Sequence, residues 1–135
     1  MIKVLIVDGE SRARDIIKTF VQWEKLGMEL VGEAGDGQDA LRQTEELHPH
    51  VVITDIQMAG TCGAGLLQTL YERYPQIRTI VVSASTDYHY AAEALRYRVL
   101  DYLLKPVDRI ELNTVLLNCK RIIRSKNRIG IENIT

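Results

Sequence analysis

Five short apolar runs along the chain have the composition of β-strands, and a stretch with helical periodicity follows each of them. The runs are 2–7 (IKVLIV), 28–34 (MELVGEA), 51–54 (VVIT), 79–83 (TIVVS) and 101–104 (DYLL). The third run is β-branched and unbroken, which is typical of a central parallel strand covered on both faces. The fifth is short enough to form a sheet edge.

Apolar residues between these runs recur at the spacing of one helix face. After the first run they are Ala13, Ile16, Ile17, Phe20 and Val21. Further helices are expected from the cap residue Asp36 to the break at Pro49, around 66–74, over about 87–97, and over 112–123. The last pattern is longer than a small sheet can cover, so we expect the end of this helix to project. The alternation of strands and helices predicts an α/β fold, a three-layer, doubly wound parallel sheet of (βα)5 type.

Polar residues stand at the carboxyl ends of four of the five strands: Asp8, Asp55, Ser83 and Lys105. Because a parallel sheet gathers these strand ends at one rim, the four side chains are expected to converge. Mg²⁺ is usually held by one or two carboxylates plus waters and substrate oxygens, and a lysine neutralises charge on a transferred phosphoryl group. The pattern therefore predicts a site that accepts a phosphoryl group on a carboxylate, with the Ser83 hydroxyl able to bind a phosphoryl oxygen and act as a switch.

Composition and charge are those of one soluble domain. The 135 residues are 46% hydrophobic and 26% charged. Residues 1–118 hold 12 Lys and Arg against 17 Asp and Glu, a net charge of −5, whereas residues 119–135 hold five basic residues and one acidic residue, a net charge of +4. The acidic body argues against a dedicated nucleic-acid binder. Cys62 and Cys119 have no partner at metal spacing, and no apolar run approaches the roughly 18 residues of a membrane span, so we expect a cytoplasmic protein with no membrane partner.

Four stretches carry a resemblance to a known family: VLIVDGE, VVITDIQMAGTCG, IVVSAS and DYLLKPVD. They resemble the receiver domain of bacterial two-component response regulators, over about residues 1 to 120. The resemblance implies a flavodoxin-like fold with strand order 2-1-3-4-5 and Asp55 as the residue phosphorylated by a sensor histidine kinase. It also implies a switch rather than a turnover enzyme, with at most slow self-dephosphorylation.

The same resemblance assigns the other residues of the rim. Asp8, Asp55 and the backbone carbonyl of Gln57 would hold Mg²⁺. Lys105 would bind the phosphoryl group, and Ser83 and Tyr102 would form the switch pair. The peptide bond before Pro106 is expected to be cis.

Finer features are similar to a subgroup of these regulators that carries an AraC-type helix-turn-helix output domain. They are QWEKLGMELVGEAGDG, ITDIQM, TDYHYAAEAL and DYLLKPVD. That output domain is not in this chain, so DNA would be contacted only through it. We expect residues 1–122 to be the receiver domain and residues 123–135 to be the start of a helical linker toward the absent domain, or a disordered tail. The face of the fourth helix, fifth strand and fifth helix is expected to form a homodimer, with Tyr88, Tyr90 and Tyr102 on it.

Gly9 departs from the family pattern, which has an acidic pair followed by Glu. Here Asp8 is followed by Gly9 and then by Glu10, which could reach the metal through water. The alternative hypothesis is therefore a pseudo-receiver, an interaction module with a weakened Mg²⁺ site that signals without phosphorylation.

A third hypothesis is a dinucleotide-binding enzyme, since GDGQDA at 35–40 matches G-x-G-x-x-G/A after a strand. Against it, Asp55 lies only 15 residues beyond Ala40 and the motif falls in the second βα unit. Asp36 and Gly37 as a helix cap and turn explain the same letters, so this hypothesis is set aside.

Overall fold

The computed structural model describes residues 1–58 and 61–134, with side chains described for 1–57 and 65–126. Its centre is a five-stranded sheet in which every neighbouring pair is parallel. The strands are β1 (Ile2–Val7), β2 (Met28–Ala34), β3 (Val51–Thr54), β6 (Arg78–Ser83) and β7 (Asp101–Leu104). Their order is β2-β1-β3-β6-β7, which confirms the predicted order 2-1-3-4-5.

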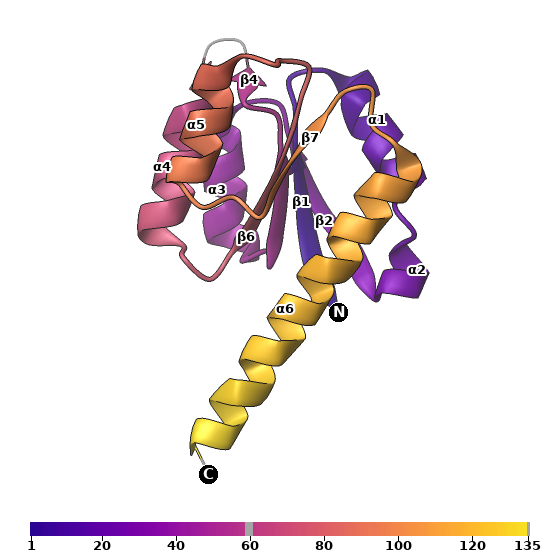
Figure 1. Ribbon diagram of the computed structural model, residues 1–135, viewed down its shortest axis with the longest axis vertical. Coiled ribbons are helices and arrows are strands. Elements are labelled where there is room, and N and C mark those ends of the chain that lie inside the picture. The colour runs from indigo at the N-terminus through magenta and orange to yellow at the C-terminus, as the bar shows by residue number, and fades with distance from the viewer. Residues whose placement is uncertain (59–60, 135) are drawn as a thin grey trace.

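Helices cover both faces of this sheet and make three layers (Figure 1). They are α1 (Ser11–Phe20), α2 (Trp23–Leu26), α3 (Gly37–Leu47), α4 (Gly63–Arg73), α5 (Tyr88–Arg96) and α6 (Arg109–Ile134). Figure 1 shows α1, α2 and α6 on one side of the strands and α3, α4 and α5 on the other. The short α2 was not anticipated from the sequence.

The alternation of side chains along the strands divides the core between the two faces. In β1, Val4 and Ile6 belong to the apolar cluster that α1 and α6 complete. Leu5 and Val7 belong to the cluster under α3 and α4. Successive residues of a strand point to opposite faces, so a strand that is apolar throughout is buried on both sides. The predicted doubly wound sheet depends on this feature.

Asp36 caps α3 as predicted, because its Oδ1 accepts a hydrogen bond of 2.8 Å from the backbone N–H of Asp39. This cap accounts for Asp36 of the GDGQDA stretch, and Gly37 is the first residue of the helix. Between β3 and α4 the chain forms a short antiparallel pair, β4 (Gln57–Met58) and β5 (Thr61–Cys62), which the sequence pattern did not indicate.

The last helix starts on the sheet and continues beyond it. Leu112, Leu116 and Cys119 of α6 are fully buried in the core. Figure 1 shows the yellow half of α6 extending past the strands, with the chain end away from the body of the domain. The helix runs to Ile134 without interruption, and the boundary at residue 122 stays a prediction. Among the described helices, none combines the length and the apolar character that crossing a membrane requires.

Candidate functional site

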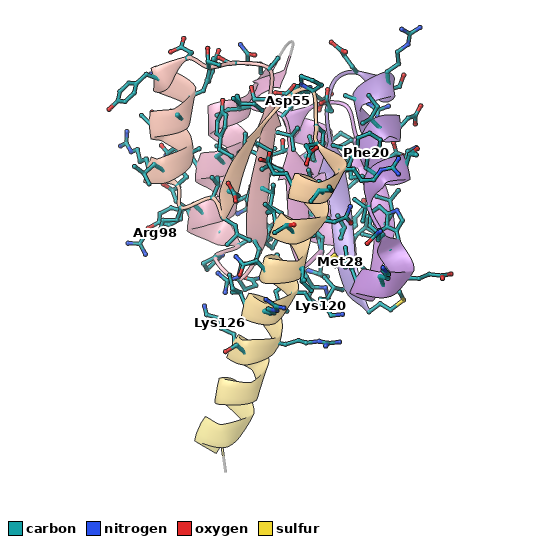
Figure 2. All side chains as sticks on the ribbon, turned by 45° about the vertical axis from the view of Figure 1, so that its right-hand side comes forward. Phe20, Met28, Asp55, Arg98, Lys120 and Lys126 are labelled. Carbon is teal, nitrogen blue, oxygen red and sulfur yellow. The ribbon has the colours of Figure 1, made fainter. Side chains whose placement is uncertain are left out.

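Asp8 and Asp55 lie side by side because they follow directly on paired strands. Val7 and Thr54 are register partners in β1 and β3, and the Asp55 N–H donates a hydrogen bond of 2.9 Å to the carbonyl of Val7. Both aspartates are buried, with 2% and 7% of their surface exposed. In Figure 2, Asp55 is labelled near the end of the strands opposite to the projecting half of α6.

One oxygen of each carboxylate fixes its own loop. Asp8 Oδ1 accepts a hydrogen bond of 3.0 Å from the N–H of Glu10, and Asp55 Oδ1 accepts one of 2.9 Å from the N–H of Gln57. Such bonds two residues along the chain hold an aspartate in a set orientation. The two Oδ2 atoms are therefore the ones that remain for chemistry at the rim.

Lys105 joins the two Oδ2 atoms. Its Nζ donates hydrogen bonds of 2.8 Å to Asp8 and 2.8 Å to Asp55. Burial alone would lower the pKa of Lys105, but the hydrogen bonds and charges of the two carboxylates outweigh it and raise this pKa above its ordinary value. The ammonium is therefore charged at neutral pH and stands where it can neutralise a third anionic group.

Ser83 and Tyr102 are linked through Ser85 rather than directly. The Ser83 side chain is fully buried, and its Oγ accepts a hydrogen bond of 3.1 Å from the Ser85 N–H. The Tyr102 hydroxyl donates a hydrogen bond of 3.1 Å to the Ser85 carbonyl. Sequence reasoning missed Ser85, although a serine two residues after another serine at a strand end is a usual turn pattern.

The backbone ties Lys105 to the same strand end, since its N–H donates a hydrogen bond of 2.8 Å to the Ser83 carbonyl. The Lys105–Pro106 peptide bond is cis. The sheet therefore brings together Asp8, Asp55 and Lys105 by side-chain contacts, and holds Ser83 beside them by this backbone bond.

The rim fits a magnesium ion held by few protein ligands. Asp8 and Asp55 with Lys105 carry a net charge of −1, which favours a cation, and Mg²⁺ keeps several waters with only one or two carboxylates. Among the described side chains, no group of three or more acidic, histidine or cysteine residues is placed to hold a metal. Glu10 and Gln57, the other two expected metal-site residues, are exposed.

Arg14 is a further residue of the site that sequence reasoning missed. Its Nη1 donates a hydrogen bond of 2.6 Å to the Asp8 carbonyl, while its Nε donates one of 3.1 Å to Glu33 on β2. Lys18 Nζ donates a hydrogen bond of 2.9 Å to the other carboxylate oxygen of Glu33. Glu33, one of the two acids within the run MELVGEA, was the only signal in the sequence for this contact.

Residues 4–117 match the model of the response regulator receiver domain, and the chain belongs to this family. It is 36% identical to the transcriptional regulatory protein YesN of Bacillus subtilis, over 83% of this chain and 30% of that protein. It is 34% identical to the transcriptional regulatory protein HptR of Staphylococcus aureus, over 86% of this chain and 45% of that protein. The chain thus spans less than half the length of these curated relatives.

A solved structure has the same fold. The REC domain of AraT, a response regulator from Geobacillus stearothermophilus, is 34% identical, with a TM-score of 0.87 over 93% of this chain and 97% of that one. The predicted family and fold are therefore confirmed.

Proposed function

We propose that this chain is the phosphoacceptor receiver domain of a transcriptional response regulator, phosphorylated on Asp55 by a sensor histidine kinase. The observation that supports it most is the contact of one ammonium with two buried carboxylates, at 2.8 Å each. Such a trio is suited to transfer between anionic groups, because the cation reduces the repulsion that a carboxylate nucleophile meets.

Asp55 Oδ2 would attack the phosphorus of the donor, forming a phosphorus–oxygen bond as the bond to the donor nitrogen breaks. Asp8, Asp55 and the Gln57 carbonyl would hold Mg²⁺, which supplies further charge neutralisation when bound. Lys105 would leave its position between the two carboxylates and pair with the phosphoryl oxygens. Contact with the two carboxylates raises the pKa of Lys105 and keeps it charged before transfer, and an anionic phosphoryl group would favour the charged form after it.

Ser83 and Tyr102 would pass the effect of Asp55 phosphorylation from the rim to the surface of the domain. In the described conformation the Ser83 hydroxyl accepts the Ser85 N–H, and Tyr102 is bound to the Ser85 carbonyl. A Ser83 hydroxyl that donates to a phosphoryl oxygen would draw its loop toward the rim. Because Ser83 and Tyr102 both bind Ser85, a movement of the Ser83 loop would also move Tyr102. The effect of phosphorylation would then reach the face of α5 and β7.

The output is proposed to be transcription through an AraC-type DNA-binding domain that lies outside this chain. The two regulators named above are both transcriptional, and α6 leads away from the domain (Figure 1). In this proposal the receiver itself contacts the kinase and a second copy of the chain, and no DNA.

The test is to incubate the chain with acetyl phosphate and Mg²⁺ and to measure its intact mass. We expect one phosphate adduct in the wild type and none in Asp55→Asn. That variant keeps the shape of the side chain and removes its charge. An adduct that persists in Asp55→Asn, or a wild type that gains none, would contradict the proposal.

The second candidate is the pseudo-receiver, and Gly9 favours it. With Gly9 at the rim, Asp8 and Asp55 are the only carboxylates that Lys105 contacts among the described side chains, and one ammonium already pairs with both. A Mg²⁺ titration separates the candidates. Binding in the millimolar range or tighter that Asp55→Ala abolishes supports the phosphoacceptor, and its absence supports the pseudo-receiver.

A further inference from the structure

A hollow of about 530 Å³ lies at the opposite end of the sheet from Asp55. It is bordered by the end of α4, the start of β6, the segment between α5 and β7, and α6. Its main lining residues are Tyr71, Tyr74, Arg78, Arg98, Leu100 and Lys126. In Figure 2, Arg98 and Lys126 are labelled on this side of the molecule, far from Asp55.

Positive charge dominates the lining. Arg78, Arg98 and Lys126 come from three separate elements, and Glu72 is the one carboxylate among the residues that line the hollow. Within the described part of the chain, none of the three cations takes part in an ion pair. Three cations beside a single carboxylate repel each other, and a further anion among them would relieve that repulsion.

Arg78 lines the hollow and carries a buried hydrogen-bond donor. Its Nε is buried and has no hydrogen-bond partner among the described residues. Its charge also reaches the interior, where burial raises the pKa of the Cys119 thiol to about 11 and Arg78 opposes that rise. Buried donors without a partner are rare in folded proteins and call for a specific explanation.

Arg98 is held over the hollow by an unusual backbone conformation. It follows α5 with a φ of 54°, in the left-handed region that few residues other than glycine adopt. Its guanidinium lies 5.9 Å from the centre of the Tyr71 ring. The ring therefore helps to place the charge at the mouth of the hollow.

We propose that this hollow binds a small phosphorylated molecule of about nucleotide size. Guanidinium groups match phosphate oxygens in two-point contacts, which favours phosphate over other anions. The volume lies in the usual range for small-ligand sites, about 300–1,000 Å³. Tyr71 and Leu100 offer a surface for the part of the molecule that carries no charge.

The site is separate from the Asp8–Asp55–Lys105 rim and does not depend on phosphorylation there. Its occupant would join Arg78 of the sheet to Lys126 on the outer half of α6. A bound phosphate would therefore fix the direction in which this helix leaves the domain. That gives the receiver a second input, which acts on the helix rather than on the rim.

The test is a calorimetric titration of the whole chain with ATP, in EDTA so that no metal site contributes. Arg98→Gln and Lys126→Gln remove one cation each and are expected to weaken binding by about 10-fold or more, the size of one lost charge-assisted hydrogen bond. Lys120→Gln is the matched control. It removes the same charge from the same helix, but Lys120 Nζ lies toward Gly27 and away from the hollow.

Titrations with pyrophosphate and with adenosine show whether the hollow recognises the phosphate groups of ATP or its nucleoside. Saturable binding of ATP and pyrophosphate that Arg98→Gln and Lys126→Gln weaken and Lys120→Gln leaves unchanged supports the proposal, and binding that none of the three variants changes overturns it. It is overturned if neither compound binds saturably, if adenosine binds and pyrophosphate does not, or if all three variants weaken binding equally. None of these results affects the mass measurement on Asp55, so the two proposals fail independently.

Discussion

Gly9 limits the number of carboxylates at the rim, yet the surrounding structure leaves room for one more. A Cβ built on Gly9 would lie 3.6 Å from the Gly35 carbonyl oxygen, an ordinary contact distance, and the backbone of Gly9 is not left-handed. The residue is also exposed. Its side chain could therefore reach solvent and the rim without displacing the fold.

Gly9→Asp is expected to bind Mg²⁺ at least about 10-fold more tightly, which is the lower end of what ligand-sphere changes typically produce. The added carboxylate would change the net charge of the rim from −1 to −2, because Lys105 balances only one of the carboxylates. Amide shifts of Glu10 and Gln57 during a Mg²⁺ titration would measure the affinity. Gly9→Asn is the control, with the same shape and no charge. Equal affinity in the wild type and Gly9→Asp would show that the metal site is misplaced.

Arg14 contacts the backbone of the loop that carries Asp8 and Gly9. Its guanidinium is a cation with no acceptor atom, so it cannot be a metal ligand. It donates to the carbonyl of Asp8 and is therefore a positioning residue. Glu33 accepts a hydrogen bond from this guanidinium, and Lys18 in turn holds Glu33. The orientation of Asp8 thus depends on how α1 packs against β2.

Arg14→Gln is expected to weaken Mg²⁺ binding by about 10-fold, as loss of a second-layer partner typically does. Arg14→Lys should restore little of the lost Mg²⁺ affinity, because a single ammonium cannot serve two acceptors in fixed directions as a guanidinium does. The exposed Arg12→Gln on the same helix is the matched control for charge. An unchanged affinity in Arg14→Gln, with Asp55→Ala still abolishing binding, would refute the positioning role and leave the phosphoacceptor proposal intact.

At the scale of elements, β2 meets α3 at an unusually close approach. A Cβ on Gly32 would overlap with the side-chain oxygen of Gln43 and lie 3.1 Å from Leu47 Cδ1 and 3.2 Å from Leu5 Cδ1. Gln43 cannot move freely, because its Nε2 donates hydrogen bonds to the Glu33 carbonyl at 2.6 Å and to Asp39 at 2.9 Å. Glycine is therefore required at this position for packing.

Gly32→Ala is expected to lower the free energy of unfolding by about 1–3 kcal/mol, the usual cost of an oversized group in a packed interior. Gly35→Ala is expected to change the free energy of unfolding little, because its Cβ would come no nearer than 4.0 Å to Arg14 Nη1. Urea unfolding of the two variants measures the difference. Equal stability of the two would mean that α3 can shift away from β2 without loss.

The sequence predicted the elements well, and it failed where structure depends on contacts between them. The five strands, their order and the Asp36 cap follow from periodicity, family likeness and local hydrogen bonding. The pairing of β1 with β2 shifts between Val4 and Leu5, which no residue pattern indicates. The same holds for the site: Asp8, Asp55 and Lys105 are marked by their strand ends, whereas Arg14 and Ser85 act through backbone carbonyls whose positions only the packing defines.

At the scale of the whole molecule, the edge of the sheet beside the switch residues is apolar and open. Strand β7 is an edge strand next to β6, with Tyr102 on it. Tyr88 and Leu95 on α5 are 84% and 81% exposed, and Leu104 on β7 is 47% exposed. Exposed apolar groups of this kind favour a protein partner. A shift of Tyr102 would alter this face directly.

We expect phosphorylation to turn the chain from monomer to dimer through this face, because burying Leu95 and Tyr88 removes apolar surface from water. Sedimentation velocity with and without acetyl phosphate and Mg²⁺ measures the change. Leu95→Glu should keep the phosphorylated chain monomeric, since a charge would be buried without a partner. Leu117→Glu changes an exposed leucine on the side of α6 that faces α2, and this variant should dimerise like the wild type. A phosphorylated wild type that stays monomeric would rule out this face as a phosphorylation-dependent dimer contact. Dimers lost only in Leu117→Glu would move the contact to the side of α6 that faces α2.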